Sequence, residues 1–477
     1  MNMKKYPALL LCCAAVLSCL FGCSREDPPA ETGTGTAPAT TASPGVVTRP
    51  ADEDDIPFET DFKGAGVDLL CWAEKSDWEW GLSDGSGDAL RRAIFEKKEK
   101  VENRLNIRVS ARTVTGDWSG RKEFLAAVKA DGSAPDLVLQ NSAVVGTLAV
   151  QGCYADLSTV DFVNFDKPWW PGNQQKTCSI RGKLYAALGD ASVTLREETQ
   201  CILANADLIA SQKLDSPETA VSSGAWTAEF LLQTLQNANL PRNADGTSAR
   251  KATFAGNTAC DAMIYGGGYT VSELTDGVPA LSVRLTSPEF GQWFSFWSAF
   301  TQRQDVQTLP PSGTDGFASG NVLFHFGTLS DVRRYLPNAA FRLSFLPYPK
   351  ADAGQQEYRT VCTADATAFS IPANAKDRSL SGALLEATAS YGYHVTSPAY
   401  LANLMQNPRL DTKFNKEAAE LLHRTLTFDP ARQFPEDSSC GTMFRQMAVA
   451  SEGWDFIYKN NRALWEMSLK KIGEQLP

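Results

Sequence analysis

Short apolar runs alternate with amphipathic stretches between residues 67 and 140. Val67 to Trp72, Ile107 to Val114 and Asp136 to Gln140 each have the apolar or β-branched content of a strand. In the segment 88–106, apolar residues recur at helical spacing with charged residues on the other side, and a second helix is expected at 120–130. This β-α-β-α-β order predicts a parallel sheet covered by helices, that is, an α/β lobe.

The pattern after residue 200 becomes mainly helical. Helices are expected at 226–238, 261–265 and 288–302, the last capped by Ser287. Apolar runs predict further strands at 201–203, 322–326, 341–346 and 367–371. The middle two predict a second, smaller sheet, and the last would return the chain to the first lobe. From residue 378 the pattern is helical again, with expected interruptions at Ser397-Pro398, Asn407-Pro408 and Asp429-Pro430.

The N-terminal residues have the form of a bacterial lipoprotein signal. A basic start, Met1 to Lys5, precedes an apolar segment, Ala8 to Leu20, that is too short to span a bilayer stably, and the small Gly22 precedes Cys23. We expect cleavage before Cys23 and lipidation of its side chain, which would anchor the chain to the extracellular face of the cell membrane. A secretory signal cut elsewhere is the alternative.

The segment after Cys23 consists mainly of Pro, Thr, Ala, Gly and acidic residues, which cannot offset the entropy of ordering. We therefore expect a disordered tether. The resulting division of the chain is a signal peptide at 1–22, a lipidated cysteine and tether at 23–61, a first lobe at 62–200, a second lobe at 201–366, and a return to the first lobe with a helical C-terminal region at 367–477.

Charge and cysteine content narrow the classes of partner and site. The formal net charge of −10 argues against nucleic acid and anionic lipid as partners, so membrane contact is expected through the lipid anchor alone. Seven cysteines remain after Cys23 and never form a Cys-x-x-Cys pair, and the three histidines lack metal-ligand spacing. We expect no metal, no cofactor and a monomer, while disulfide bonds among the seven stay an open question.

A set of short motifs occurs in a fixed order along the chain. The motifs are Ala130-Asp131-Gly132, Asp136-Leu137-Val138, Gly152 to Leu157, Lys167 to Trp170, Gly182 to Tyr185 with Gly189-Asp190, Gly224 to Thr227, Phe317 to Gly320, Leu346 to Lys350, Ser397 to Tyr400 and Phe428-Asp429. Their order resembles the extracellular solute-binding lipoproteins of ABC importers, in the branch linked to carbohydrates. The resemblance implies a two-lobed α/β fold of the periplasmic-binding-protein type II, a ligand cleft between the lobes, and hinge closure that presents the loaded protein to permease subunits.

Recognition of an oligosaccharide, the expected solute, needs flat aromatic surfaces together with amides and carboxylates. Several tryptophans lie in or just after the strand ends of the first lobe, where open α/β sheets meet ligands. Packing in the core is the alternative for each, and Trp293, Phe294, Trp297 and Phe300 sit at helical spacings typical of a core. The candidate ligand-binding residues are Trp72, Trp78, Trp80, Asp117, Trp118, Gln140, Tyr185, Asp190, Trp226, Tyr265, Tyr269, Gly327 and Asp365.

The sequence supports a catalytic function less well than solute binding. Gly81 to Gly85 matches the Gly-x-Ser-x-Gly form of a hydrolase, but the strand-to-helix turn that such a serine needs is absent from the pattern. Acidic residues could supply a glycosidase pair, and the loops 84–88 and 243–246 each resemble part of a calcium loop without its terminal Glu. We therefore expect no catalytic residues. A cell-surface enzyme or sensor domain acting on glycan remains the alternative function.

Overall fold

A computed structural model describes residues 52–81, 85–116, 118–130, 132–242, 246, 249–256, 258–309, 315–334, 336–337, 339–444 and 452–476. The expectations for the signal peptide, Cys23, the tether before residue 52, Ser83 and Asp117 lie outside these residues, as does the side chain of Trp118. The expectation that the disordered tether extends to residue 61 is wrong: residues 52–61 belong to the compact unit, where Ile56 is fully buried and its carbonyl accepts a hydrogen bond from Arg104 at 2.9 Å. Every element described below belongs to one compact unit, Arg49–Pro477.

The first sheet has four strands in the order β11-β3-β1-β2. β1 (Ala65–Trp72) pairs in parallel with β2 (Ile107–Val114) and with β3 (Leu137–Asn141), whereas β11 (Thr367–Ser370) runs antiparallel to β3. The three parallel strands confirm the β-α-β-α-β prediction. The antiparallel β11 confirms that the chain returns to this sheet near residue 367.

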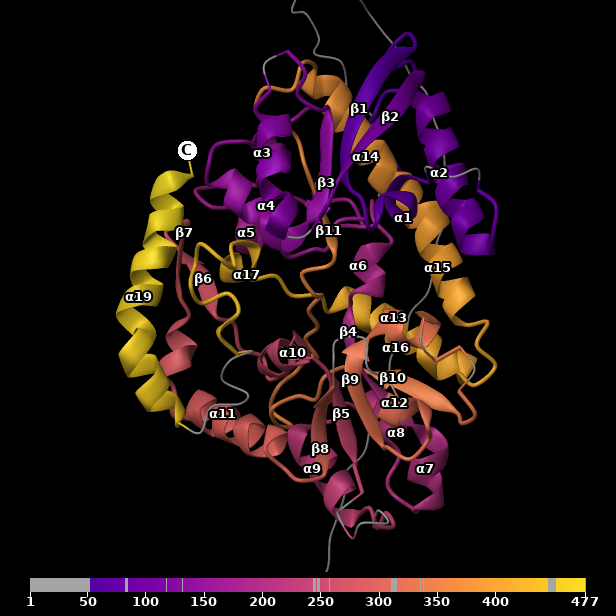
Figure 1. Ribbon diagram of the computed structural model, residues 1–477, viewed down its shortest axis with the longest axis vertical. Helices are drawn as coiled ribbons and strands as arrows, with labels where there is room; N and C mark the ends of the chain where they lie inside the picture. The colour runs from indigo at the N-terminus through magenta and orange to yellow at the C-terminus, as the bar shows by residue number, and fades with distance from the viewer. Residues whose placement is uncertain are drawn as a thin grey trace, which may run out of the picture. The chain divides into compact units, whose positions relative to one another are not determined.

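Helices cover the first sheet because their apolar stripes match its buried faces. α2 (Ala89–Leu105) buries Leu90, Ile94 and Val101, and the side chain of Asp88 caps it by accepting a hydrogen bond from the Arg91 amide. α14 (Arg378–Tyr391) packs beside α2 (Figure 1). The remaining helices of this part are α1 (Ser76–Trp80), α3 (Arg121–Val128), α4 (Ser142–Ala149), α5 (Gln174–Cys178) and α6 (Thr194–Glu197).

The second sheet has five strands in the order β10-β4-β9-β5-β8. The strands are β4 (Gln200–Asn205), β5 (Ala252–Ala255), β8 (Val306–Leu309), β9 (Phe324–Thr328) and β10 (Leu343–Leu346). β4, β9 and β10 agree with the predicted strands to within two or three residues, whereas β5 and β8 were not predicted.

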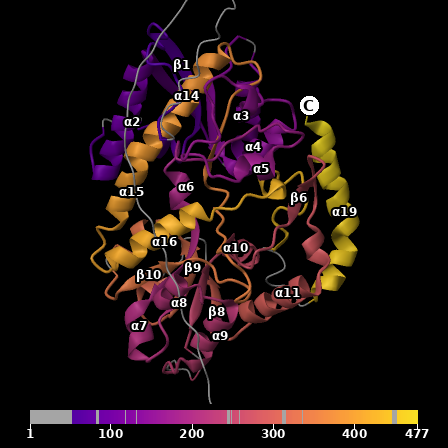
Figure 2. The same cartoon turned by 180° about the vertical axis from the view of Figure 1, so that it is seen from behind.

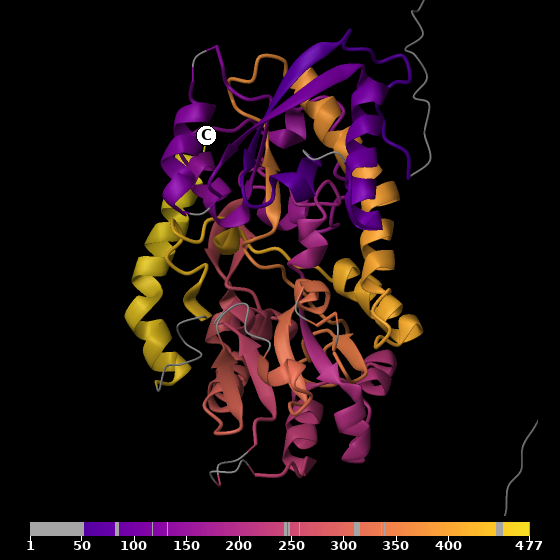
Figure 3. The same ribbon diagram turned by 45° about the vertical axis from the view of Figure 1, so that its right-hand side comes forward.

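Helices pack around the second sheet (Figure 3). The helices are α7 (Ala206–Ser211), α8 (Pro217–Ser223), α9 (Ala228–Asn237), α10 (Thr258–Gly266), α11 (Pro288–Thr301), α12 (Asp315–Ala318) and α13 (Leu329–Arg334). Trp293, Phe294, Trp297 and Phe300 of α11 are buried, which confirms their prediction as core, and Ser287 caps α11 as predicted.

The C-terminal region is helical, as predicted, and its helices are α15 (Ser397–Leu404), α16 (Thr412–Arg424), α17 (Pro430–Gln433) and α19 (Trp454–Gln475). The expected break at Ser397-Pro398 is wrong. A π-helical turn, Gly392–Thr396, joins α14 directly to α15, so the two helices follow one another (Figure 2). Pro398 falls in the first turn of α15, where its missing N–H needs no intrahelical acceptor. None of the described helices is both long and apolar enough to cross a membrane.

Three segments connect the two sheets and are bonded side by side. The Gln200 amide donates to the Val361 carbonyl at 2.9 Å, and the Thr363 amide donates to the Glu198 carbonyl at the same distance. The Thr427 amide donates to the Thr360 carbonyl at 2.7 Å. The segments 198–200, 360–363 and 425–427, here called the crossing segments, therefore form a continuous backbone ladder between the lobes.

A small hairpin adds a further contact between the two halves of the unit. It consists of β6 (Ser272–Thr275) and β7 (Val278–Leu281), and β7 packs against α19. At the hairpin turn, the carbonyl of Gly277 accepts a hydrogen bond from the amide of Arg181 at 2.7 Å. β6 also packs near α5 of the first part.

Candidate ligand cleft

A cleft of about 580 Å³ lies beside the last crossing segment. One wall is the segment 171–177 with α5, and the facing wall is formed by β6 and by residues 357–359. Residues 424–428 and Pro430 complete the lining. The volume falls within the range of small-molecule sites, and the walls come from both halves of the fold, so we take this cleft as the candidate ligand site.

The cleft combines an aromatic surface with polar and charged groups. Tyr358 and Phe428 are the aromatic residues of its lining. Burial raises the pKa of the Tyr358 hydroxyl to about 12, and this hydroxyl donates to the Val221 carbonyl at 3.4 Å. Among the described residues, the buried Oδ1 of Asn173 has no hydrogen-bond partner, which leaves an acceptor available at this wall.

Five charged side chains line the same cleft. They are Lys176, Arg359, Arg424, Glu273 and Glu357. Burial lowers the pKa of the Arg359 guanidinium, and the nearby positive charge of Arg284 lowers it further, while Glu357 opposes the shift. Glu273 already accepts a hydrogen bond from the Val283 amide at 3.1 Å.

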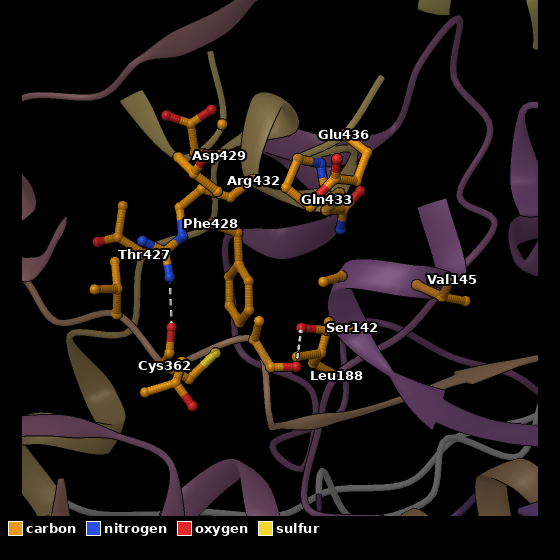
Figure 4. Close-up of a pocket in the computed structure, with 18 residues that line it drawn as sticks. Ser142, Val145, Leu188, Cys362, Thr427, Phe428, Asp429, Arg432, Gln433 and Glu436 are labelled. Atoms are coloured by element: carbon orange, nitrogen blue, oxygen red, sulfur yellow. Dashed lines mark hydrogen bonds between the residues drawn. The ribbon is translucent and has the colours of Figure 1, made fainter. Parts of the chain in front are cut away.

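A smaller cavity of about 100 Å³ shares Thr427 and Phe428 with the cleft. In Figure 4 the ring of Phe428 points into this cavity, with Arg432 and Gln433 of α17 beside it. Arg432 donates to the Cys362 carbonyl at 2.6 Å. On the opposite wall, Ser142 at the start of α4 donates to the Ala364 carbonyl at 3.0 Å.

Asp429 holds the segment that carries Phe428 and Arg432. Its carboxylate accepts hydrogen bonds from the Tyr265 hydroxyl at 2.9 Å, the Val271 amide at 2.7 Å and the Ser272 amide at 3.1 Å. The Ser272 hydroxyl and the Ala431 amide also donate to it. Burial raises the pKa of this carboxyl, although all five donors favour the ionised form. Asp429 thus ties the last crossing segment to α10 and β6.

Asp190 performs a similar structural task on the first part of the chain. Its buried carboxylate lies 3.0 Å from Nε of Arg196 and 3.5 Å from Nε2 of His423, and it accepts a hydrogen bond from Ser397 at 2.6 Å. Burial alone would raise the pKa of Asp190, but Arg196 and His423 together hold it below its ordinary value. The group joins α6 to α15 and α16.

Most of the sequence-predicted aromatic residues lie in the core. Trp80, Trp226, Tyr265 and Tyr269 are almost fully buried, and Nε1 of Trp226 donates to the Pro347 carbonyl at 2.8 Å. Trp72 is buried at the end of β1 and donates to the Thr367 hydroxyl at 2.9 Å. Large aromatic side chains contribute so much apolar surface that packing outcompetes exposure at these positions.

The other predicted residues serve local structure. Trp78 lies between the guanidinium groups of Arg91, 4.7 Å from its ring centre, and Arg333, 4.5 Å away. Buried Gln140 accepts from the Tyr154 hydroxyl at 3.2 Å, and exposed Asp365 accepts from Asn141 at 2.9 Å. Tyr185 is buried, and the backbone of Gly327 approaches the Asp331 carboxylate closely. None of the predicted residues that the structure describes lines the cleft or the smaller cavity.

Sequence reasoning missed Lys176, Arg359, Arg424 and Tyr358 as lining residues, and found Phe428 only as part of a motif. The Phe428-Asp429 pair and the proline after it were the available signals, because they mark a chain turn between two helices. None of the seven cysteines of the described structure forms a disulfide bond. Within the described residues, no group of three His, Cys, Asp or Glu side chains could hold a metal ion.

Solved structures with a similar fold share little sequence with this chain. The galacto-N-biose-/lacto-N-biose I-binding protein of an ABC transporter from Bifidobacterium longum, in complex with lacto-N-biose, has a TM-score of 0.58 at 12% identity, covering 87% of this chain and 98% of that one. The ABC substrate-binding protein of Listeria monocytogenes in complex with cycloalternan has a TM-score of 0.52 at 15% identity, covering 87% and 99%. UgpB from Mycobacterium tuberculosis in complex with glycerophosphocholine has a TM-score of 0.54 at 14% identity, covering 86% and 99%.

These likenesses confirm the two-lobed α/β fold with a helical C-terminal region. No curated protein matches the sequence. The model of one family, described as bacterial extracellular solute-binding protein, matches residues 93–405, well over half of the chain. The chain therefore belongs to the bacterial extracellular solute-binding proteins.

Proposed function

We propose that this solute-binding protein captures an extracellular oligosaccharide in the cleft and delivers it to the permease of an ABC importer. The observation that carries the proposal is the cleft itself, whose walls come from both halves of the fold and whose lining pairs Tyr358 and Phe428 with amide and charged groups. Rings of this kind cover the C–H face of a sugar, while the polar groups bond its hydroxyls.

The fold neighbours support the same class of solute and of transport. Two of them were solved with the oligosaccharides cycloalternan and lacto-N-biose, and both are binding proteins of ABC systems. The ladder of crossing segments favours hinge closure around a bound solute, which is how a loaded binding protein can differ in shape from an empty one. We further propose that the protein acts as a monomer and is held at the membrane by a lipid on Cys23.

The test is the thermal stability of the purified chain against a panel of neutral and charged oligosaccharides, short peptides and polyamines. A solute that binds only the folded state stabilises it by about 2.7 kcal/mol at a hundredfold excess over Kd. We expect a clear rise in melting temperature with an oligosaccharide and an unchanged sugar after long incubation. Appearance of a shortened glycan would instead favour the surface-enzyme alternative.

The anchor is tested separately. Replacing the proposed lipid-bearing residue, Cys23→Ala, should abolish incorporation of labelled fatty acid and release the chain from the membrane fraction, since a hydrocarbon chain supplies the attachment. A conservative change beside it, Ser24→Ala, is the control. Unchanged labelling of the Cys23→Ala chain would overturn the proposed anchor without touching the proposal for the cleft.

A further inference from the structure

Positive charge gathers in the cleft of a protein that is acidic as a whole. Three cationic side chains line it, Lys176, Arg359 and Arg424, against Glu273 and Glu357. The whole chain has 45 Lys and Arg against 55 Asp and Glu, so the balance in the cleft has the opposite sign to that of the molecule. The three cations outnumber the two glutamates of the lining, and this excess of positive charge attracts ligands of the other sign.

None of the three cations forms an ion pair with any residue in the described part of the chain. Most other arginines near the lobe junction are paired or bonded; Arg333 pairs with Glu197, and Arg196 pairs with Asp190. Arg424 ends α16, where the helix dipole already favours a cation. Lys176 lies in the last turn of the short helix α5 and is exposed to solvent, whereas Arg359 has only the nearby charge of Glu357 to offset its burial.

Arg359 is the most informative of the three. It is half-buried, lies near the like charge of Arg284, and its pKa is lowered mainly by desolvation. Glu357 lies near Arg359 without forming an ion pair with it, so the cost of burying the guanidinium is only partly offset, and an anionic ligand would offset it further. Guanidinium groups bind carboxylates and sulfate or phosphate esters in bidentate geometry, which makes such an anion the fitting partner.

The three cations also come from separate parts of the fold. Lys176 is on α5, Arg359 precedes a crossing segment, and Arg424 precedes another. Closing the cleft brings these like charges toward one another, which is unfavourable in a low-dielectric space. An anionic ligand between them removes that repulsion, so it would favour closure as well as binding.

We propose that the solute of this cleft is an acidic oligosaccharide, one that carries carboxylate or sulfate groups held by Arg359 and Lys176. The inference rests on the proposed function and narrows its substrate class. Neutral sugars of the same length would keep the aromatic contacts with Tyr358 and Phe428 but leave the cations without partners, and they would therefore bind more weakly.

The experiment measures binding of three tetrasaccharides by calorimetry: maltotetraose as the neutral probe, tetragalacturonate as the carboxylate and a carrageenan tetrasaccharide as the sulfate ester. We expect one of the acidic probes to bind at least about tenfold more tightly than maltotetraose. Raising the salt concentration should weaken that binding and leave the neutral probe almost unaffected. The preferred acidic probe identifies which anion the cleft selects.

Variants assign the effect to the named cations. Arg359→Gln and Lys176→Gln should each weaken the preferred acidic probe by about tenfold while changing maltotetraose binding less than twofold. Lys413→Gln is the matched control, because Lys413 is an exposed cation at the other end of α16 that lines neither cavity. The melting temperature of each variant without ligand shows whether it is folded. If Arg359→Gln unfolds, Lys176→Gln still tests the inference, because Lys176 is exposed and its substitution should not disturb the fold.

The possible outcomes distinguish a failure of this inference from a failure of the proposed oligosaccharide-binding function. If maltotetraose binds as tightly as both acidic probes and Arg359→Gln changes nothing, the inference fails while the oligosaccharide function stands. If inorganic sulfate alone reproduces the full stabilisation, the cleft is a plain anion site and the inference also fails. If no saccharide binds, neutral or acidic, the proposed function fails with it.

Discussion

At the scale of single residues, buried carboxylates carry much of the organisation around the lobe junction. Asp190 accepts from Arg196 and Ser397, Asp429 accepts from five donors, and Glu198 accepts from Lys75 at 3.1 Å and from the Thr363 hydroxyl at 2.8 Å. Each joins segments that are far apart in sequence. Buried charge of this kind is tolerated only when fully bonded, so these groups fix one arrangement of the segments.

Asp190 gives a prediction with a defined pH dependence. Its pKa is lower in the folded chain than the unfolded value of 3.8, so the ionised group stabilises the fold above that value. The contribution is lost as the pH falls through the folded pKa. Asp190→Asn should therefore lower the free energy of unfolding at pH 7 by roughly 3–5 kcal/mol.

The measurement is urea unfolding of the wild type and of Asp190→Asn at pH 7 and again in strong acid. The difference between them should shrink in acid, where the wild-type carboxylate is itself becoming protonated. Asp166→Asn, at an exposed position, should match the wild type at both pH values. An equal loss at neutral and acid pH would show that packing, and not charge, sets the role of Asp190.

Residue-level prediction from sequence succeeded for caps and did not reach the residues that line the candidate cleft. Ser287 and the tryptophans of α11 were predictable because capping and helical spacing are local properties. The lining of the cleft could not be predicted, because Lys176, Tyr358 and Arg424 come together only through the pairing of segments that are distant in sequence. Trp80 and Trp226 were assigned to the cleft for their chemistry, whereas their apolar area places them in the core.

At the scale of elements, the first sheet was predictable and half of the second was not. β1, β2 and β3 follow one another along the chain with a helix between each pair, which predicts their parallel arrangement but not their order in the sheet, β3-β1-β2. β5 and β8 have only four residues each, and their partners lie fifty or more residues away. Runs this short carry no periodicity that distinguishes a strand from the end of a helix.

Two glycines in helical turns give opposite predictions. A Cβ on Gly392, in the π-helical turn after α14, would lie 1.8 Å from the Asp190 carbonyl oxygen, whereas a Cβ on Gly291 in α11 would meet no atom within 4 Å. Gly392→Ala should cost about 1–3 kcal/mol through overpacking. Gly291→Ala should stabilise the chain by about 0.5–1 kcal/mol, because alanine orders at a lower entropy cost.

Chemical denaturation of both variants beside the wild type measures these two changes. Since the substitution is the same in both, any general effect of alanine on helices cancels in the comparison. A Gly392→Ala chain as stable as the wild type would mean that α14 and α15 can move away from Asp190 without loss. That result would show that the π-helical turn is not needed for stability.

At the scale of the whole molecule, the cysteines offer a probe of global opening. None of the seven described cysteines forms a disulfide bond, and burial raises the pKa of six of them, to about 11 for Cys362 and to about 12 for Cys440. Thiolate is the reactive form, so alkylation of the native chain should be slow. Mass spectrometry should find Cys362 modified first, because it is the only one of the seven that is not fully buried.

The same experiment answers the disulfide question that the sequence left open. A reductant should leave the melting temperature unchanged, and denaturant should expose all seven thiols to alkylation at once. Rapid labelling of Cys71 or Cys201 in native buffer would contradict the packing described for the two sheets, where both lie fully buried in strands. Isotope-coded reagents added before and after unfolding distinguish the two populations.

The ladder formed by the crossing segments limits how the lobes can move. Sliding or twisting one lobe on the other would stretch the bonds at Val361, Glu198 and Thr360, whereas bending across the ladder leaves them intact. Bending is therefore the motion that the ladder itself permits. A distance between two labels, one on each sheet, would follow that motion, and its distribution would give the free-energy profile of closure.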